Sequence, residues 1–177
     1  MKLGQADNSE RFAELALPHL DAAYNLARWL TRDPGDASDV VQEAMLRALR
    51  FIGSYRGGSG KSWLLTIVRN TAIDWIRINR PAQIAPPVGD DDPLENIADE
   101  ADNPEAALIR VGDRQQIDRL IAALPAEFRE CLVLRELEDL SYKEIAAVTG
   151  VPIGTVMSRL ARARQLMQRN WTRENAR

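Results

Sequence analysis

Cysteine and histidine are almost absent from the chain, which has one of each, Cys131 and His19, among 177 residues. A single cysteine excludes an internal disulfide framework and a cysteine-based metal cluster. A histidine-based triad or zinc site would have to depend on one imidazole. We therefore expect no metal site and no catalytic residue, and we expect Cys131 to be a buried structural thiol.

Long apolar runs are missing as well. The apolar runs are short, as in residues 63–65 and 145–147, whereas a membrane-spanning helix needs about 20 apolar residues. The start of the chain contains no apolar core of signal-peptide length. The sequence thus predicts no membrane segment of its own and a cytoplasmic location.

The charged side chains are unevenly distributed, although the net charge is only -3. Residues 1–81 carry 11 basic and 9 acidic side chains, whereas residues 82–113 carry 1 basic and 9 acidic ones. Residues 141–177 carry 7 basic and 2 acidic side chains. A basic end on an acidic chain is where a polyanion such as nucleic acid is expected to dock.

Apolar residues recur at helical spacing along most of the chain. The pattern predicts a helix that starts near Pro18, a second one capped by Asp36 or Ser38, and a third one that ends before Pro81. Helical spacing resumes near Pro104 and continues towards the C-terminus. No stretch shows convincing strand alternation, so the predicted fold class is all-α.

Residues 82–103 separate the two helical parts. They contain three prolines and three consecutive aspartates, so this segment buries little and its charges repel one another. We expect two small helical domains, residues 1–81 and 104–177, joined by a flexible acidic linker.

The C-terminal part contains a helix-turn-helix pattern. Ser141 and Glu144 have the spacing of a capping box that opens a short helix, and Gly150 can supply the left-handed residue that ends it. A second helix is expected from Thr155 to about Arg169. In a DNA-binding helix-turn-helix, this second helix enters the major groove.

Polar residues of the second helix are candidates for contacts with DNA: Thr155, Ser158, Arg159, Arg162 and Arg164. The first four can share one exposed side of the helix, and Arg164 is expected near the phosphates. Arginine makes bidentate contacts with guanine and neutralises phosphates. The alternative is a solvated basic helix on an ordinary helical hairpin.

A glycine-rich break follows the second predicted helix of the N-terminal part and combines aromatic and basic side chains. Phe51 and Tyr55 offer faces on which an unstacked base can stack, and Arg56 and Lys61 can contact phosphates. Residues 57–62 also look like the end of a nucleotide-binding P-loop. Tyr55 occupies the position of the first glycine, however, and a helix is predicted where a P-loop needs a strand.

Two stretches of the C-terminal part resemble the fourth domain of the extracytoplasmic-function (ECF) sigma factors of bacterial RNA polymerase. They are residues 140–164, LSYKEIAAVTGVPIGTVMSRLARAR, and residues 123–130, ALPAEFRE. The resemblance implies that the helix-turn-helix reads the upstream (minus-thirty-five) promoter element and touches the β flap of the polymerase. Met157 departs from the pattern, because many family members have arginine or lysine there, so Arg159 and Arg162 carry the expected base contacts.

Residues 39–49, DVVQEAMLRAL, are similar to the helix of the second sigma domain that binds the clamp helices of the β′ subunit. Asp39, Gln42, Glu43 and Arg47 lie at helical offsets that can form one polar face, which the resemblance implies is a core polymerase-binding face. Without the resemblance, an ordinary solvated amphipathic face would explain the same pattern.

Residues 63–77, WLLTIVRNTAIDWIR, resemble the helix of the second domain that faces the downstream (minus-ten) promoter element. Arg69, Asn70 and Arg77 are its candidate DNA contacts, whereas its two tryptophans are expected in the core. The preceding loop, with Phe51 among its residues, is expected to assist strand opening.

The predicted function is therefore that of a sigma factor, which binds core RNA polymerase, recognises promoter DNA and assists strand opening. It is expected to need no cofactor and not to be an enzyme. The resemblance also implies control by an anti-sigma factor, and the free chain is expected to be a monomer because no coiled-coil seam is evident. Two alternatives stay open: a dimeric helix-turn-helix regulator with a helical sensor domain, and a P-loop enzyme.

Overall fold

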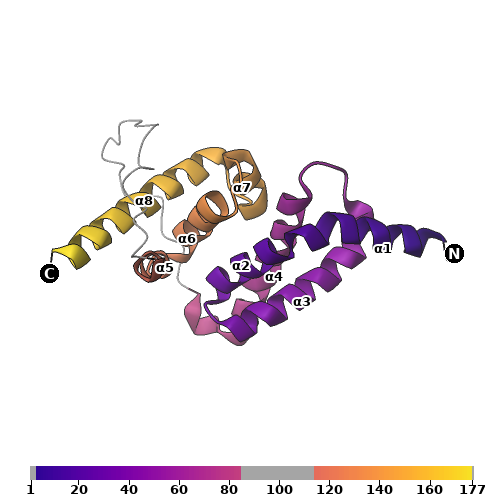
Figure 1. Cartoon of the computed structure of the whole chain (residues 1–177), viewed down its shortest axis with the longest axis horizontal. Helices are drawn as coiled ribbons and strands as arrows, with labels where there is room; N and C mark the ends of the chain where they lie inside the picture. The colour runs from indigo at the N-terminus through magenta and orange to yellow at the C-terminus, as the bar shows by residue number, and fades with distance from the viewer. Residues whose placement is uncertain (1–2, 85–113, 177) are drawn as a thin grey trace.

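The computed structural model describes residues 3–84 and 114–176, and every regular element in these ranges is helical (Figure 1). The all-α fold class is thereby confirmed. The first range contains α1 (Leu3–Ala16), α2 (Leu20–Thr31), α3 (Pro34–Phe51) and α4 (Gly60–Asn79), with 3₁₀ turns at Leu17–His19, Ile52–Ser54 and Pro81–Gln83. The second range contains α5 (Arg114–Ala122), α6 (Ala126–Leu132), a π-helical turn at Val133–Leu137, α7 (Tyr142–Thr149) and α8 (Ile153–Asn175).

The start of α3 is set by Asp33 and Pro34. The Asp33 carboxylate accepts a hydrogen bond from the backbone N–H of Asp36 at 2.9 Å. Pro34 occupies the first turn, where its fixed φ and its missing N–H are tolerated. The prediction that Asp36 or Ser38 caps this helix is wrong, because the proline lets the helix begin earlier.

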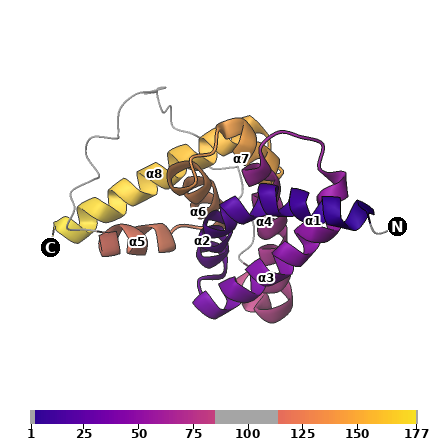
Figure 2. The ribbon, with the colours of Figure 1, turned by 45° about the vertical axis from the view of Figure 1, so that its right-hand side comes forward.

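Helices α1–α4 form the N-terminal bundle, in which α2, α3 and α4 pack against one another and α1 contacts α3 and α4 (Figures 1 and 2). Fully buried apolar side chains come from each of the three main helices, among them Leu26, Val40 and Leu64. The two tryptophans of α4 are partly buried and pack against the core, as expected. Burial of these apolar side chains is the main stabilising term of the bundle.

Helices α5–α8 form the C-terminal bundle, in which α8 packs on α5, α6 and α7. Ile145 of α7 and Val156 and Leu160 of α8 are buried in its core, as their spacing predicted. Cys131 of α6 is fully buried, which confirms the expected structural thiol. Burial also raises the pKa of this thiol to about 11, so it stays protonated and unreactive at neutral pH.

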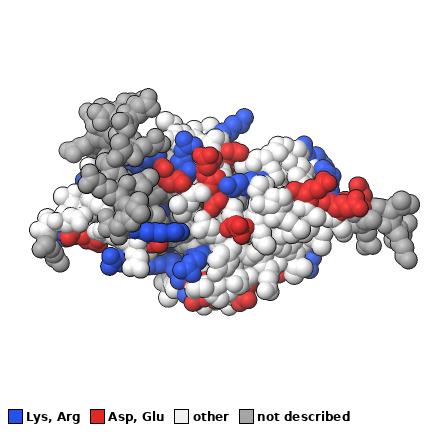
Figure 3. All heavy atoms as spheres, viewed as in Figure 1, with Lys and Arg blue, Asp and Glu red and all other residues white. Residues whose placement is uncertain are grey.

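The two bundles contact each other where α4 meets α7 and α2 meets α6 (Figures 1 and 2). We call this contact the interbundle seam. Hydrogen bonds and ion pairs cross it between Asn25, Lys61, Ser62 and Arg69 on one side and Glu130, Glu138 and Glu144 on the other. On the face shown in Figure 3, acidic and basic side chains are interspersed around the middle of the molecule.

The predicted linker lies outside the described residues from residue 85 onward, and so does the expected beginning of the second domain at residues 104–113. Of the first linker residues, Ala82 and Gln83 belong to the 3₁₀ turn after α4, and Ile84 is exposed. Among the helices in the described ranges, none is both long and apolar enough to span a bilayer.

Candidate nucleic-acid interface

Helices α7 and α8 form the predicted helix-turn-helix. The capping box is present: Ser141 Oγ accepts from the backbone N–H of Glu144 at 3.2 Å, and the Glu144 carboxylate accepts from the backbone N–H of Ser141 at 2.8 Å. Gly150 ends α7 with a φ of 73°, a left-handed conformation that strains residues with a side chain. Helix α8 begins at Ile153, slightly before the predicted Thr155.

The candidate upstream contacts lie in the first half of α8, but they are not equally open to solvent. Arg159 is only 15% exposed, and its Nη2 lies 3.4 Å from Glu127 Oε2 of α6. Arg164 Nη2 donates to Glu136 Oε1 at 2.9 Å. The other candidates are half-buried: Thr155, Ser158 and Arg162. The expected exposed position is therefore wrong for Arg159, because the acid of α6 holds it against the bundle; its contact with DNA stays a prediction.

The outermost large side chains at the start of α8 are apolar. Ile153 is 45% exposed and Met157 is 47% exposed, and their spacing places them one turn apart on the same face. A Cβ added to Gly154 between them would meet nothing within 4 Å. Sequence analysis missed Ile153, because the helix was expected to begin after it, and assigned Met157 no role.

The two candidate aromatic residues at the loop between α3 and α4 differ in how open their rings are to solvent. Phe51 is 57% exposed. The ring of Tyr55 lies edge-on to that of Trp63, with centroids 5.5 Å apart, and Arg11 lies 5.6 Å from its centroid. The Tyr55 hydroxyl donates to the Gly58 carbonyl at 2.6 Å. In this state Phe51 offers a free stacking surface and Tyr55 does not.

Glycines set the path of this loop. Gly57 and Gly58 have φ values of 102° and 92°, which residues with a side chain rarely adopt. The exposed Arg56 donates to the Gly53 carbonyl at 2.8 Å. Helix α3 precedes the loop, and residues 3–84 contain no strand, so the loop lacks the strand–loop–helix setting of a P-loop.

The downstream candidates near and on α4 are divided between solvent and the interbundle seam. Two are exposed: Asn70 and Arg77. Arg69 Nε donates to Glu130 Oε1 at 2.6 Å, and Lys61 Nζ donates to the backbone carbonyl of Glu138 at 2.7 Å. Two of the predicted DNA contacts therefore already have partners in the C-terminal bundle.

The candidate polymerase-binding residues lie on the outer side of α3. Asp39 and Gln42 are exposed. Arg47 Nε donates to Glu43 Oε1 at 2.9 Å, and its Nη1 donates to Asp74 Oδ2 of α4 at 3.1 Å. The predicted polar face is thus present, with Arg47 held in place by α4.

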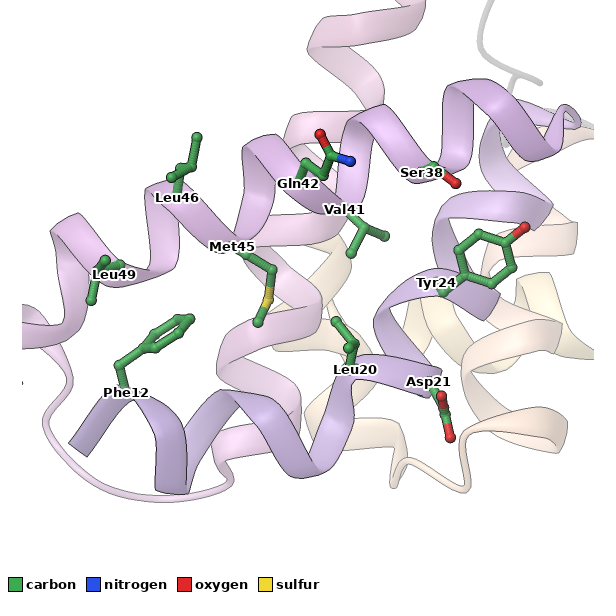
Figure 4. A pocket seen from close by; sticks show the side chains of 10 residues that line it. All are labelled: Phe12, Leu20, Asp21, Tyr24, Ser38, Val41, Gln42, Met45, Leu46 and Leu49. Carbon is green, nitrogen blue, oxygen red and sulfur yellow. The ribbon is translucent and has the colours of Figure 1, made fainter. Parts of the chain in front are cut away.

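A cavity of about 750 Å³ opens beside this face, between α3 and helices α1 and α2. We call it the α3 groove. In Figure 4, Val41, Met45 and Leu49 of α3 face Phe12 and Leu20 across it. Its lining is mostly apolar and several lining side chains are exposed, which is typical of a protein-binding groove.

Known proteins match both bundles. Residues 15–81 match sigma-70 region 2, and residues 114–167 match sigma-70, region 4. The ECF RNA polymerase sigma-E factor of Escherichia coli (strain K12) is 40% identical over 139 residues, which cover 74% of this chain and 71% of that protein. The chain belongs to the ECF sigma factors. The ECF RNA polymerase sigma factor SigE of Mycolicibacterium smegmatis is 35% identical over 155 residues, covering 88% of this sigma factor and 59% of that protein.

Solved structures have the same arrangement of helices as this sigma factor. The sigma factor RpoE of Bartonella quintana, solved in complex with the anti-sigma factor NepR, superposes with a TM-score of 0.68 and 31% identity, covering 89% of this chain and 94% of that chain. CnrH, solved in complex with the cytosolic domain of CnrY, superposes with a TM-score of 0.65 and 22% identity, covering 94% of this chain and 91% of that chain. The second likeness concerns the fold alone.

Two buried acids at the seam of this sigma factor escaped sequence analysis. Glu130 is 5% exposed and Glu138 is 6% exposed. Burial raises the pKa of Glu130, and the hydrogen bond from Arg69 opposes this only in part. Their partners Arg69 and Lys61 lie 61 and 77 positions away in the chain, and no local pattern signals such long-range pairs.

Proposed function

We propose that this sigma factor binds core RNA polymerase, directs it to promoters and assists strand opening without covalent chemistry or a cofactor. The single observation that carries the proposal is the presence, in one chain, of a helix-turn-helix and a second helical bundle that match sigma-70 regions 4 and 2. We assign residues 1–81 to the polymerase-binding and downstream-element domain, residues 82–103 to a linker, and residues 104–177 to the upstream-element domain.

The polymerase contact is proposed for the outer side of α3. Asp39, Gln42, Glu43 and Arg47 form its polar part, and the α3 groove lies directly beside it. An apolar groove edged by polar side chains fits a helical partner, here the clamp helices of the β′ subunit. The β flap is the proposed second polymerase contact, through the C-terminal bundle.

Promoter recognition is proposed for both bundles. In the C-terminal bundle, the proposed contacts with the upstream element are Thr155, Ser158, Arg159, Arg162 and Arg164. In the N-terminal bundle, the proposed contacts with the downstream element and the melted strand are Phe51, Tyr55, Arg56, Lys61, Arg69, Asn70 and Arg77. Exposed Phe51 supplies a stacking face, and stacking is worth about 1–3 kcal/mol per base.

An anti-sigma factor is the proposed controlling partner. The relative from Bartonella quintana was solved with the anti-sigma factor NepR, and that chain is covered almost completely by the superposition. A protein that covers the polymerase-binding or DNA-binding surface would switch this sigma factor off by competition. Because the proposed partners are polymerase and promoter DNA, we also propose that the protein acts in the cytoplasm. We propose that the free chain is a monomer.

Reconstitution tests the proposal directly. The full chain is mixed with core RNA polymerase, and the complex is isolated by size-exclusion chromatography and used for run-off transcription from promoter-containing genomic fragments. We expect co-elution and new transcripts that start at defined positions. Stable dimers that bind duplex DNA tightly without polymerase, and no transcript with it, would instead identify a dimeric regulator.

A further inference from the structure

The start of α8 exposes an apolar pair where a DNA-reading helix usually presents polar groups. Ile153 and Met157 are 45% and 47% exposed. The basic residue nearest to them in sequence, Arg159, is 15% exposed and paired with Glu127, and the Ser158 hydroxyl donates to the Thr155 carbonyl at 3.0 Å. The side chains that project furthest at this end of the helix are therefore hydrocarbon and thioether groups.

Duplex DNA is the occupant that this face fits. In a helix-turn-helix, the N-terminal residues of the second helix contact base edges in the major groove. The surrounding segment, residues 141–177, carries 7 basic and 2 acidic side chains, which complements phosphate. The open space beside Gly154 lets a neighbouring molecule approach the helix backbone closely.

The chemistry of the pair selects one base. Thymine is the base that displays a methyl group in the major groove, and apolar side chains contact it there. We propose that Ile153 and Met157 read thymine methyl groups in the upstream promoter element. This inference rests on the proposed function. It assigns base specificity to two apolar residues that are not among the polar contacts proposed for the upstream element.

A methyl-specific binding assay tests the proposal. The reconstituted holoenzyme first selects promoters from a random duplex pool, and each thymine of the enriched upstream element is then replaced singly by deoxyuridine, which lacks only the methyl group. We expect one or more replacements to weaken binding by about fourfold, the effect of losing one buried methyl-sized group. When the holoenzyme carries Met157→Ala or Ile153→Ala, the same deoxyuridine replacement in the DNA should change binding much less.

The control is Leu137→Ala, which removes an apolar side chain of similar exposure, 46%, outside α8. It should keep the full sensitivity to deoxyuridine. Met157→Arg should shift the selected element towards guanine, because arginine contacts guanine in a bidentate way. If no pool sequence is enriched, the proposed function fails. If an element is enriched but no deoxyuridine replacement changes binding, the methyl-reading inference is overturned. It is also overturned if both alanine variants keep the full sensitivity to deoxyuridine.

Discussion

Arg159 of the recognition helix and Glu127 of α6 form an ion pair, with Arg159 Nη2 3.4 Å from Glu127 Oε2. Glu127 is 30% exposed, so the pair lies at the edge of the bundle and not in its centre. If Arg159 contacts a base or a phosphate, this pair must first break. Glu127 therefore competes with DNA for the guanidinium.

We predict that Glu127→Gln strengthens binding to the upstream element by about two- to fivefold. This factor corresponds to the small free energy that a partly exposed ion pair contributes. The gain should disappear in the double variant with Arg159→Ala. Arg159→Ala alone should weaken specific binding by roughly 1–3 kcal/mol if it reads a base. Fluorescence anisotropy with specific and scrambled duplexes at several salt concentrations measures both effects.

The matched control is Glu136→Gln, which removes the corresponding acid beside Arg164. Because Arg164 is assigned to phosphate contact, this variant should change binding about equally on specific and scrambled DNA. Discrimination that remains intact in Arg159→Ala would remove Arg159 from base readout.

The capping box of α7 sets a second prediction. Ser141 Oγ accepts from the Glu144 N–H, and the Glu144 carboxylate accepts in return from the Ser141 N–H. Ser141→Ala should lower the free energy of unfolding by about 1 kcal/mol, because one backbone N–H at the start of α7 loses its hydrogen-bond partner. Urea denaturation followed by circular dichroism measures it. The control is Thr172→Ala, which removes a hydroxyl that donates to the Gln168 carbonyl near the C-terminal end of α8. It should change the free energy of unfolding less.

Local features of this kind were predictable from the sequence, and long-range ones were not. The capping box, the left-handed Gly150 and the buried face of α7 and α8 follow from spacings within about one or two helical turns. The pairing of Arg69 with Glu130 joins residues 61 positions apart, and it depends on how the two bundles meet. Arg159 was misplaced for the same reason, since its exposure is decided by an acid on another helix.

The third prediction concerns pH. Burial raises the pKa of Glu130, with Arg69, Arg159 and Glu127 as the charged groups around it. A carboxyl with a raised pKa holds its proton more tightly in the folded state. Its contribution to stability is therefore fully present below the unfolded pKa of about 4.3 and is lost as pH rises through the higher folded value.

Glu130→Gln should remove this dependence, because the amide keeps the shape of the side chain without the buried charge. We expect the variant to gain stability relative to the parent at pH 7 and the difference to shrink at pH 4. Urea unfolding at several pH values measures the difference. Glu136→Gln is the control, since that acid is 49% exposed, and it should leave the pH profile unchanged. A parent that is more stable than Glu130→Gln at pH 7 would show that the pair with Arg69 outweighs the cost of burial.

The last prediction concerns strand opening by the loop before α4. Phe51 is 57% exposed, whereas the Tyr55 ring is packed against Trp63 and its hydroxyl is bound to Gly58. A base can stack on Phe51 without any rearrangement of the loop, but Tyr55 must first leave these partners. Asn70 is exposed on α4 and can bond a base edge.

We therefore expect Phe51→Ala to reduce promoter opening about tenfold, within the range of one lost stacking contact, and Tyr55→Ala to reduce it less. Permanganate reactivity of unpaired thymines measures opening, and co-elution with core polymerase should be unchanged in both variants. Leu17→Ala, at a similarly exposed apolar residue with 52% exposure outside the loop, should open the promoter normally. A template with a pre-melted bubble should restore most of the activity of Phe51→Ala, because the cost of unpairing is then already met. Normal opening of duplex promoter by Phe51→Ala, Tyr55→Ala and Asn70→Ala alike would make the loop a connector and would place melting on other residues of the N-terminal bundle.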